Sequence, residues 1–105
     1  MTYRIRLHPA VGDDLKAIAE MVSSYAGAES AQRALDEIEY ALLSLAETPH
    51  KGSLRDEIVA GLRAIPAGRK AVIAFTVDDS VHTVFVHVIG YAGSDWINRA
   101  AARGQ

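Results

Sequence analysis

Two amphipathic stripes follow one another in the first half of this chain, with only a few residues between them. Apolar side chains recur at spacings of three and four residues over 9–25 and again over 29–46, which is the period of one helix face. The stripes are Val11, Leu15, Ile18, Val22 and Tyr25, then Ala31, Leu35, Ile38, Leu42 and Leu45. Because the linker around Gly27 is short, the two helices form an antiparallel hairpin. The joint apolar face of this hairpin must be buried against another part of the chain.

The rest of the sequence predicts strands that can supply that part. Residues 3–8 alternate apolar and polar side chains, as a half-buried strand does. Further apolar runs predict strands at 62–65, 70–77 and 81–91, the second nearly all apolar and the last two joined by the turn Asp78-Asp79-Ser80. In the last strand we expect Val81, Thr83, Phe85, His87 and Ile89 on one face, and Val84, Val86 and Val88 on the other.

Two segments remain outside these helices and strands. Residues 50–60 are polar and contain glycine, so we expect a surface loop with a short turn at Ile58-Val59. Residues 96–103 predict a short C-terminal helix. The fold class is therefore α+β in the order β-α-α-β-β-β, with the helical hairpin packed on a small, mainly antiparallel sheet. The length of 105 residues predicts a single domain spanning 1–105.

Composition excludes several classes of protein. The chain has no cysteine, so it has neither a disulfide framework nor a thiolate metal site. No apolar run approaches the roughly 20 residues that span a bilayer, and the first residues show no signal-peptide core; we expect a cytoplasmic protein with no membrane association. The net charge of −2 argues against direct binding to nucleic acid, because phosphate neutralisation usually requires a basic excess.

Three segments in order suggest a family. The first is HPAVGDDL, which enters the first helix, and the second is LRAIPAGRKAVIAF, which places Arg63 and Arg69 around a Pro-Ala-Gly turn. The third is VIGYAGSDW at the end of the last strand. Together with the order of elements, these segments resemble the ParE/RelE superfamily of bacterial type II toxin–antitoxin toxins, from Tyr3 to Trp96.

The resemblance implies one of two activities. RelE-like toxins resemble small ribonucleases that cut mRNA on the ribosome, whereas ParE-like toxins poison DNA gyrase and are not known to be hydrolases. Toxins of both kinds are neutralised by a cognate antitoxin, which docks a helix and sometimes adds a strand to the toxin. The resemblance therefore implies a cognate antitoxin as partner.

Ribonuclease chemistry requires a base, an acid and cations near the phosphate. Arg63 and Arg69 are the candidate phosphate contacts, and Tyr91 ends the last strand, where RelE-like toxins tend to place a catalytic Tyr or His. Each residue also has a structural interpretation. The arginines can be solvated or paired with Asp56 or Glu57, and Tyr91 can be a packed aromatic with a hydrated hydroxyl.

The histidines do not form a recognisable site. His8, His50, His82 and His87 lack the spacing that gathers metal ligands on one helix, so no metal and no cofactor is expected. His87 is interpreted as a core histidine and His82 as an exposed turn residue. Trp96 either caps the core or marks an interface.

The absence of a coherent catalytic set favours a ParE-like, non-enzymatic toxin with DNA gyrase as its target. Two alternatives remain open at this stage. One is a RelE-like mRNA endonuclease that uses Arg63, Arg69 and Tyr91. The other is a homologue that has lost its toxicity and only binds its antitoxin.

Overall fold

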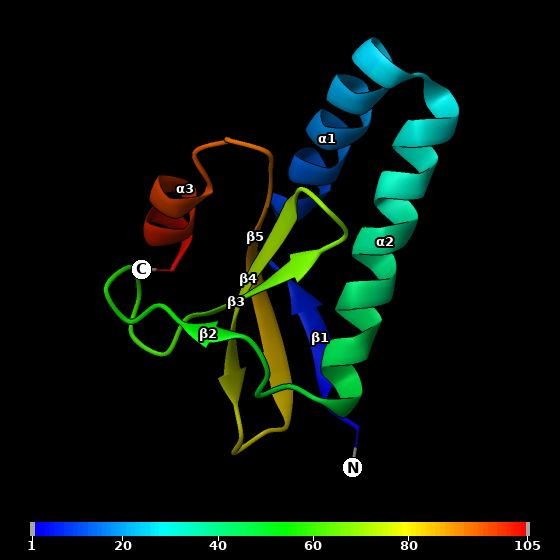
Figure 1. Ribbon diagram of the computed structural model, residues 1–105. Helices are drawn as coiled ribbons and strands as arrows, with labels where there is room; N and C mark the ends of the chain where they lie inside the picture. The colour runs from blue at the N-terminus through cyan, green and yellow to red at the C-terminus, as the bar shows by residue number, and fades with distance from the viewer. Residues whose placement is uncertain (1, 105) are drawn as a thin grey trace.

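A computed structural model of the chain describes residues 2–104, and Figure 1 shows a helical hairpin beside a sheet. The elements are β1 (Arg4–Leu7), α1 (Val11–Ala26), α2 (Ala28–Glu47), β2 (Ser53–Leu54), β3 (Arg63–Ala67), β4 (Ala71–Asp78), β5 (Thr83–Tyr91) and α3 (Trp96–Arg103). The predicted α+β order and the C-terminal helix are confirmed. The segment predicted as a loop at 50–60 contains one additional strand, the two-residue β2.

The five strands form one sheet in the order β1-β5-β4-β3-β2. β1 runs parallel to β5, and all the other neighbours are antiparallel. The helical hairpin connects β1 to β2, which lie at opposite edges of the sheet. The first and last strands of the chain, β1 and β5, are neighbours. The prediction of a mainly antiparallel sheet is confirmed.

The helical hairpin begins two residues later than its sequence pattern indicated. Pro9 and Ala10 form a turn before α1, because His8 engages the N–H groups there: Ala10 N donates to His8 Nδ1 at 3.0 Å and Val11 N donates to the His8 carbonyl at 2.9 Å. Gly27 joins the two helices with a φ of 92°. Residues other than glycine are strained in that conformation, so the linker can be as short as one residue.

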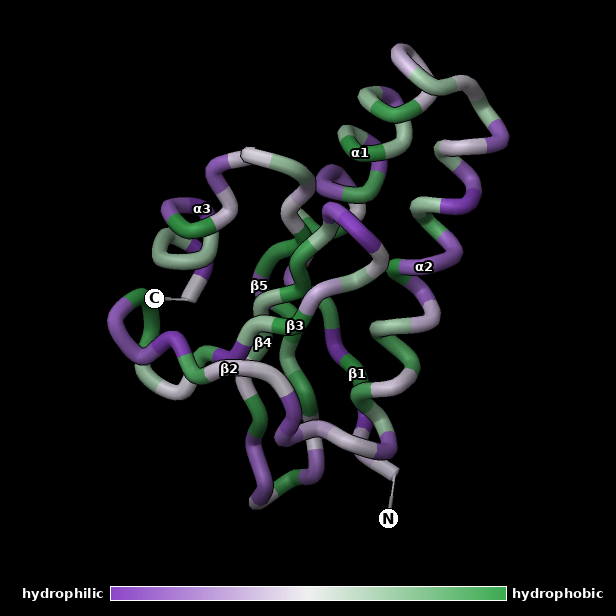
Figure 2. The backbone as a smooth tube through the Cα atoms, in the orientation of Figure 1, coloured by the Kyte–Doolittle hydropathy of each residue, from purple (hydrophilic) through white to green (hydrophobic). Residues whose placement is uncertain are grey.

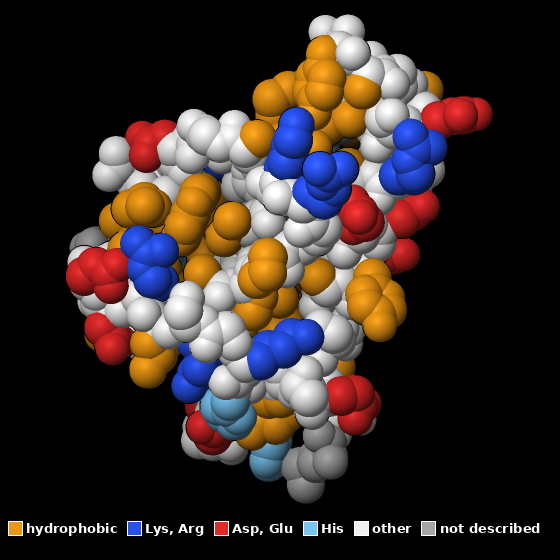
Figure 3. All heavy atoms as spheres, in the orientation of Figure 1, with side chains coloured by type: hydrophobic (Ala, Val, Ile, Leu, Met, Phe, Trp, Pro, Cys, Tyr) orange, Lys and Arg blue, Asp and Glu red, His pale blue; other side chains and the backbone are white. Residues whose placement is uncertain are grey.

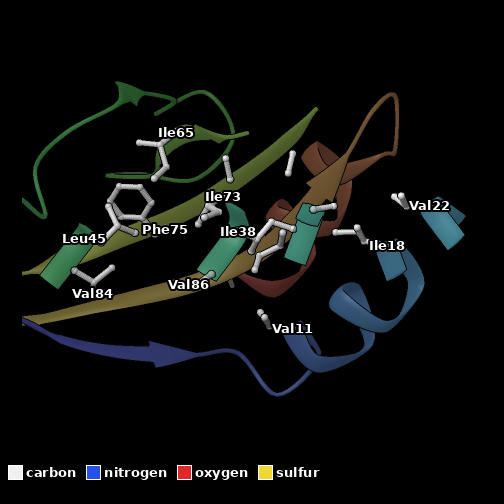
Figure 4. Close-up of a cluster of buried hydrophobic side chains, with 14 of the residues drawn as sticks. Val11, Ile18, Val22, Ile38, Leu45, Ile65, Ile73, Phe75, Val84 and Val86 are labelled. Carbon is white, nitrogen blue, oxygen red and sulfur yellow. The ribbon is translucent and has the colours of Figure 1, made fainter. Parts of the chain in front are cut away.

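The hairpin buries its apolar stripe against one face of the sheet. The buried residues of this cluster include Val11, Ile18, Val22, Ile38 and Leu45 from the helices and Ile65, Ile73, Phe75, Val84, Val86 and Ile89 from the strands. Figure 4 shows the strand side chains projecting toward the helices, and in Figure 2 hydrophobic colour runs along much of β4 and β5. The predicted burial of the joint helix face is confirmed. Among residues 2–104, no helix is long and apolar enough to cross a membrane.

A β-bulge changes the faces of β5. Ala74 pairs with Val88 but Phe75 pairs with Val86, so His87 is an extra residue on β5. The bulge reverses the alternation beyond it, and Ile89 joins Val86 on the helix side of the sheet. The prediction that put Ile89 on the face of His87 is therefore wrong, as is the grouping of Val88 with Val86.

The opposite face of the sheet is partly covered by α3. Leu62, Ala74, Val88 and Ala100 form a second buried cluster, against which Ile58, Val59 and Trp96 pack. Gly90 permits this close approach, because a Cβ added there would lie only 2.5 Å from the Cβ of Trp96. Of the two interpretations of Trp96, the structure therefore favours a cap on the core.

Asp14 connects three elements through its buried carboxylate. It lies on α1 and is 4% exposed. The Ile89 N–H of β5 donates to Oδ2 at 3.0 Å, and α3 contributes Arg99 to Oδ1 at 2.7 Å and Arg103 to Oδ2 at 2.6 Å. The hydrogen bonds to Asp14 raise the pKa of Arg103. A buried carboxylate requires such partners, and here they fix α3 to the rest of the molecule.

Replacing Asp14 with alanine should destabilise the protein by about 2–4 kcal/mol, because two arginines and one backbone N–H lose their acceptor. Urea unfolding measures this loss, and hydrogen exchange should show α3 opening first. Asp13→Ala is the matched control, since Asp13 is exposed and its removal should cost no more than about 0.5 kcal/mol. Equal stability of the two variants would contradict the assigned role of Asp14.

Candidate functional site

An apolar groove runs between α2 and β3, and we call it the α2–β3 groove. Its volume is about 640 Å³. Its lining residues are Asp36, Glu37, Tyr40, Ala41, Ser44, Lys51, Gly52, Ile65, Pro66, Ala67 and Gly68. Most of these lining residues are apolar or small, so the groove suits an apolar ligand surface better than a charged one.

Two features keep the groove open. The strand β2 pairs only with Arg63 and Ala64, which leaves Ile65–Ala67 at an edge of the sheet. On the other side, α2 directs Tyr40 to solvent with 79% of its surface exposed, and Leu43 nearby is 65% exposed. Large apolar side chains that stay this exposed next to an open strand edge are typical of protein-binding surfaces.

A second hollow lies where the turn between β3 and β4 approaches the end of the helical hairpin, and we call it the tip pocket. Its lining residues are Val22, Tyr25, Ala26, Ser30, Arg33, Ala34, Glu37, Ala67, Arg69, Lys70 and Tyr91. The pocket brings three cations together: Arg33 from α2 and Arg69 and Lys70 from the turn. Figure 3 shows Lys and Arg side chains gathered below the tip of the hairpin.

Two tyrosines meet in the tip pocket. The hydroxyls of Tyr25 and Tyr91 are 3.4 Å apart, and the ammonium group of Lys70 lies 5.5 Å from the centre of the Tyr25 ring. The hydrogen bond to Tyr25, with smaller effects of burial and of Glu37, raises the pKa of Tyr91 to about 12. Tyr91 therefore keeps its proton at neutral pH, and its phenolate form is disfavoured.

The structure separates the three residues expected at a ribonuclease site. Arg69 and Tyr91 line the tip pocket, but Arg63 lies at the other end of β3, where its Nη1 donates to the His50 carbonyl at 2.8 Å. Arg63 and Ala67 are the first and last residues of β3 and lie four residue steps apart, which corresponds to about 13 Å. The sequence suggested one group of arginines around the turn, whereas Arg63 lies at the end of β3 that is farther from this turn.

The expected ion pairs of these arginines are also absent from residues 2–104. Glu57 pairs with Arg55 at 2.6 Å, and the carboxylate of Asp56 accepts the Gly61 N–H at 2.8 Å. Both carboxylates are thus occupied by close neighbours in the same loop. Of the two structural interpretations of these arginines, pairing with Asp56 or Glu57 is therefore wrong, whereas Arg69 is exposed to solvent and Arg63 is half-buried.

His87 is a buried residue on the bulge, in agreement with its interpretation as a core histidine. Its Nε2 lies 2.9 Å from the hydroxyl of Thr76, while its Nδ1 is buried without a hydrogen-bond partner. Burial, with a smaller effect of His8, lowers the pKa of His87. His82 is exposed in the turn before β5, as predicted, with a φ of 49°.

One polar cluster was not anticipated. The carboxylate of Asp79 accepts the Tyr3 hydroxyl at 2.7 Å and lies 2.7 Å from His50 Nε2. The Tyr3 hydrogen bond lowers the pKa of Asp79 and raises that of Tyr3. Within residues 2–104, no group of three or more His, Asp or Glu side chains is placed to hold a metal ion. The cluster ties the start of β1 to the turn between β4 and β5.

Tyr40, Arg33 and Lys70 were not singled out in the sequence. Tyr40 and Arg33 lie outside the apolar stripe of α2, so the sequence alone predicts only that they are exposed to solvent. Lys70 follows Arg69 directly, so the pair did mark the turn as basic. The third cation comes from α2, and only tertiary packing brings it to the same pocket.

Comparisons with known proteins identify similar sequences and folds. The family model for the ParE toxin of the type II toxin–antitoxin system, parDE, matches residues 5–96. No curated protein sequence matches the chain significantly. A solved structure of the chromosomal ParDE toxin–antitoxin system from P. aeruginosa includes a chain with a similar fold. Its TM-score is 0.73 at 21% sequence identity, and the match covers 87% of this chain and 97% of that chain.

Two further solved structures are similar. The toxin–antitoxin complex RelBE2 of Mycobacterium tuberculosis gives a TM-score of 0.59 at 18% identity, with coverage of 87% of this chain and 99% of that chain. A mutant of the E. coli toxin RelE in the free state gives a TM-score of 0.66 at 16% identity, with coverage of 97% and 96%. At these identities the structures demonstrate a shared fold.

Tyr25→Phe should lower the pKa of Tyr91 from about 12 toward the ordinary value of 10.0, because the hydrogen bond that favours the protonated phenol is lost. A spectrophotometric titration of tyrosinate measures the change. Tyr40→Phe is the control, since it removes an exposed hydroxyl outside the pocket and should leave the highest titration step in place. An unchanged highest step in Tyr25→Phe would contradict the proposed coupling.

Proposed function

Because the chain belongs to the ParE toxin family of type II toxin–antitoxin systems, we propose that it binds and inhibits DNA gyrase and is neutralised by a cognate antitoxin. In this proposal the protein acts by binding and not by catalysis. The family match over residues 5–96 supports the class of toxin, and the dispersed catalytic candidates support the ParE-like branch.

The dispersal of the catalytic candidates is the observation that carries the choice of branch. Arg63 is bound to the His50 carbonyl at one end of β3, whereas Arg69 and Tyr91 lie at the other end. A phosphate bound at Arg69 and Tyr91 is therefore out of reach of Arg63. The raised pKa of Tyr91, about 12, also disfavours the phenolate that would act as a base toward a 2′-hydroxyl.

The α2–β3 groove is the proposed docking site for the antitoxin. A helix that lies in an apolar groove buries its own apolar face there, and Tyr40 is exposed along the rim to meet it. The solved P. aeruginosa ParDE and M. tuberculosis RelBE2 structures come from toxin–antitoxin systems, which supports an antitoxin as the occupant. Burial of Tyr40 would then remove from water the one aromatic side chain of α2, which is 79% exposed.

An mRNA endonuclease remains the second candidate, and one observation favours it. Arg33, Arg69 and Lys70 surround Tyr91 in the tip pocket, where they could hold a phosphate while the phenol donates a proton to the leaving oxygen. In this version of the site Arg63 has no role. The test below is therefore designed to separate the two targets.

Expression of the protein in cells without an antitoxin should stop growth with filamentation and an SOS response, and the purified protein should inhibit gyrase in a supercoiling assay at micromolar concentration. Arrested translation with cleaved mRNA would instead support the endonuclease. Normal growth together with uninhibited supercoiling would contradict a toxin of either kind and would favour a homologue that has lost its toxicity.

Variants sharpen this comparison. Tyr91→Phe removes the proton of the candidate acid while it preserves the packed ring, and Arg63→Ala removes the arginine at the far end of β3. If the protein is a gyrase inhibitor, Tyr91→Phe should leave inhibition within about threefold of the unmodified protein, since no proton transfer is involved. An endonuclease should lose about 100-fold or more of its cleavage rate.

A further inference from the structure

The α2–β3 groove and the tip pocket form one continuous surface along α2, because Glu37 and Ala67 line both hollows. The surface changes character along its length. Tyr40, Ala41 and Ile65 make the groove apolar, whereas Arg33, Arg69 and Lys70 make its end at the hairpin tip cationic. In Figure 3 hydrophobic side chains lie below the gathered Lys and Arg side chains on the same face.

Within the part of the chain that the structure describes, the three cations have no carboxylate partner in an ion pair. None of the four ion pairs in residues 2–104 includes Arg33, Arg69 or Lys70. Arg33 donates only to the Ser30 hydroxyl, at 2.9 Å. One carboxylate, Glu37, packs against the turn, where a Cβ added to Gly68 would lie 2.5 Å from its Oε1. The lining of the tip pocket thus holds these three cations and one carboxylate, a positive excess on a chain whose net charge is −2.

From this surface, and on the premise of the proposed function, we infer that the antitoxin segment in the groove is an amphipathic helix with an acidic end, and that this acidic end lies on Arg33, Arg69 and Lys70. The apolar face of the helix covers Tyr40 and Ile65. Acidic side chains at one end match the unpaired cations, and this match fixes the direction in which the helix lies.

The edge of β3 favours a helix over an added strand. Beyond the residues paired with β2, only Ile65–Ala67 remain at the edge, and Pro66 has no N–H to donate. An added strand would therefore gain few backbone hydrogen bonds there. A helix loses nothing at Pro66, because the backbone groups in its interior are paired within the helix and its affinity comes from apolar burial.

The test is the affinity of the purified protein for its cognate antitoxin, measured by titration at low and at moderate salt. The variant carries Arg33→Glu, Arg69→Glu and Lys70→Glu together. These side chains lie at the surface, so the variant should unfold at nearly the same temperature as the unmodified protein. We expect binding to weaken by about 100-fold at low salt, because three attractions become repulsions. The dependence of affinity on salt should weaken or reverse.

The matched control applies the same change in charge away from the groove, through Arg4→Glu and Arg6→Glu on β1 and Lys16→Glu on α1. All three side chains are exposed, and none takes part in an ion pair within residues 2–104. This control separates the local cluster from the net charge of the molecule. Its affinity should stay within about threefold of that of the unmodified protein.

The outcomes distinguish a failure of the proposed function from a failure of the inference about the acidic end. If the unmodified protein does not bind the antitoxin at all, the proposed function fails and the inference fails with it. Two results overturn only the inference about the acidic end. One is that the Arg33→Glu, Arg69→Glu, Lys70→Glu variant binds the antitoxin as tightly as the unmodified protein. The other is that the control variant loses as much affinity as this triple variant. The triple variant is also tested for binding of a fluorescent RNA oligonucleotide and for self-association. If the three substitutions abolish either of these while antitoxin binding is unchanged, the cations serve RNA binding or self-association, and the inference is overturned.

Discussion

The structure depends on one constraint: the apolar stripe shared by α1 and α2 has a single sheet face against which it can be buried. Ile38 and Leu45 meet Ile73 and Phe75 there, and each of these four side chains is at most 1% exposed. This packing holds α2 along β3. Because β2 protects only the first two residues of β3, the same packing leaves the α2–β3 groove open beside the rest of that strand.

The opposite sheet face is closed in a different way. A short helix, α3, covers Leu62, Ala74 and Val88, and the carboxylate of Asp14 holds it through Arg99 and Arg103. Most of this helix lies beyond the residues that match the ParE toxin family model, which end at Trp96. The α2–β3 groove borders the sheet face that the hairpin covers, whereas α3 packs on the opposite face, so the proposed partner could occupy the groove without displacing α3.

Much of the fold could be predicted from the sequence because its signals are local. The spacing of Val11, Ile18 and Val22 indicates a helix whatever lies opposite, and the apolar runs that follow give the order of the later strands along the chain, but not their order in the sheet. The bulge at His87 could not be predicted, since it exists only in the pairing of β5 with β4. The candidate site was harder for the same reason: Arg63 and Arg69 are close in sequence but lie at opposite ends of β3, while Arg33 reaches Arg69 only through the packing of α2.

The central claim is that the α2–β3 groove holds the antitoxin, and hydroxyl-radical footprinting of the complex tests it most directly. Tyr40 is 79% exposed on the groove rim, and Val81 is 63% exposed in the turn between β4 and β5, away from the groove. The account predicts that complex formation slows the oxidation of Tyr40 several-fold and leaves that of Val81 unchanged. Oxidation of Tyr40 at the same rate in the free and bound protein would contradict it.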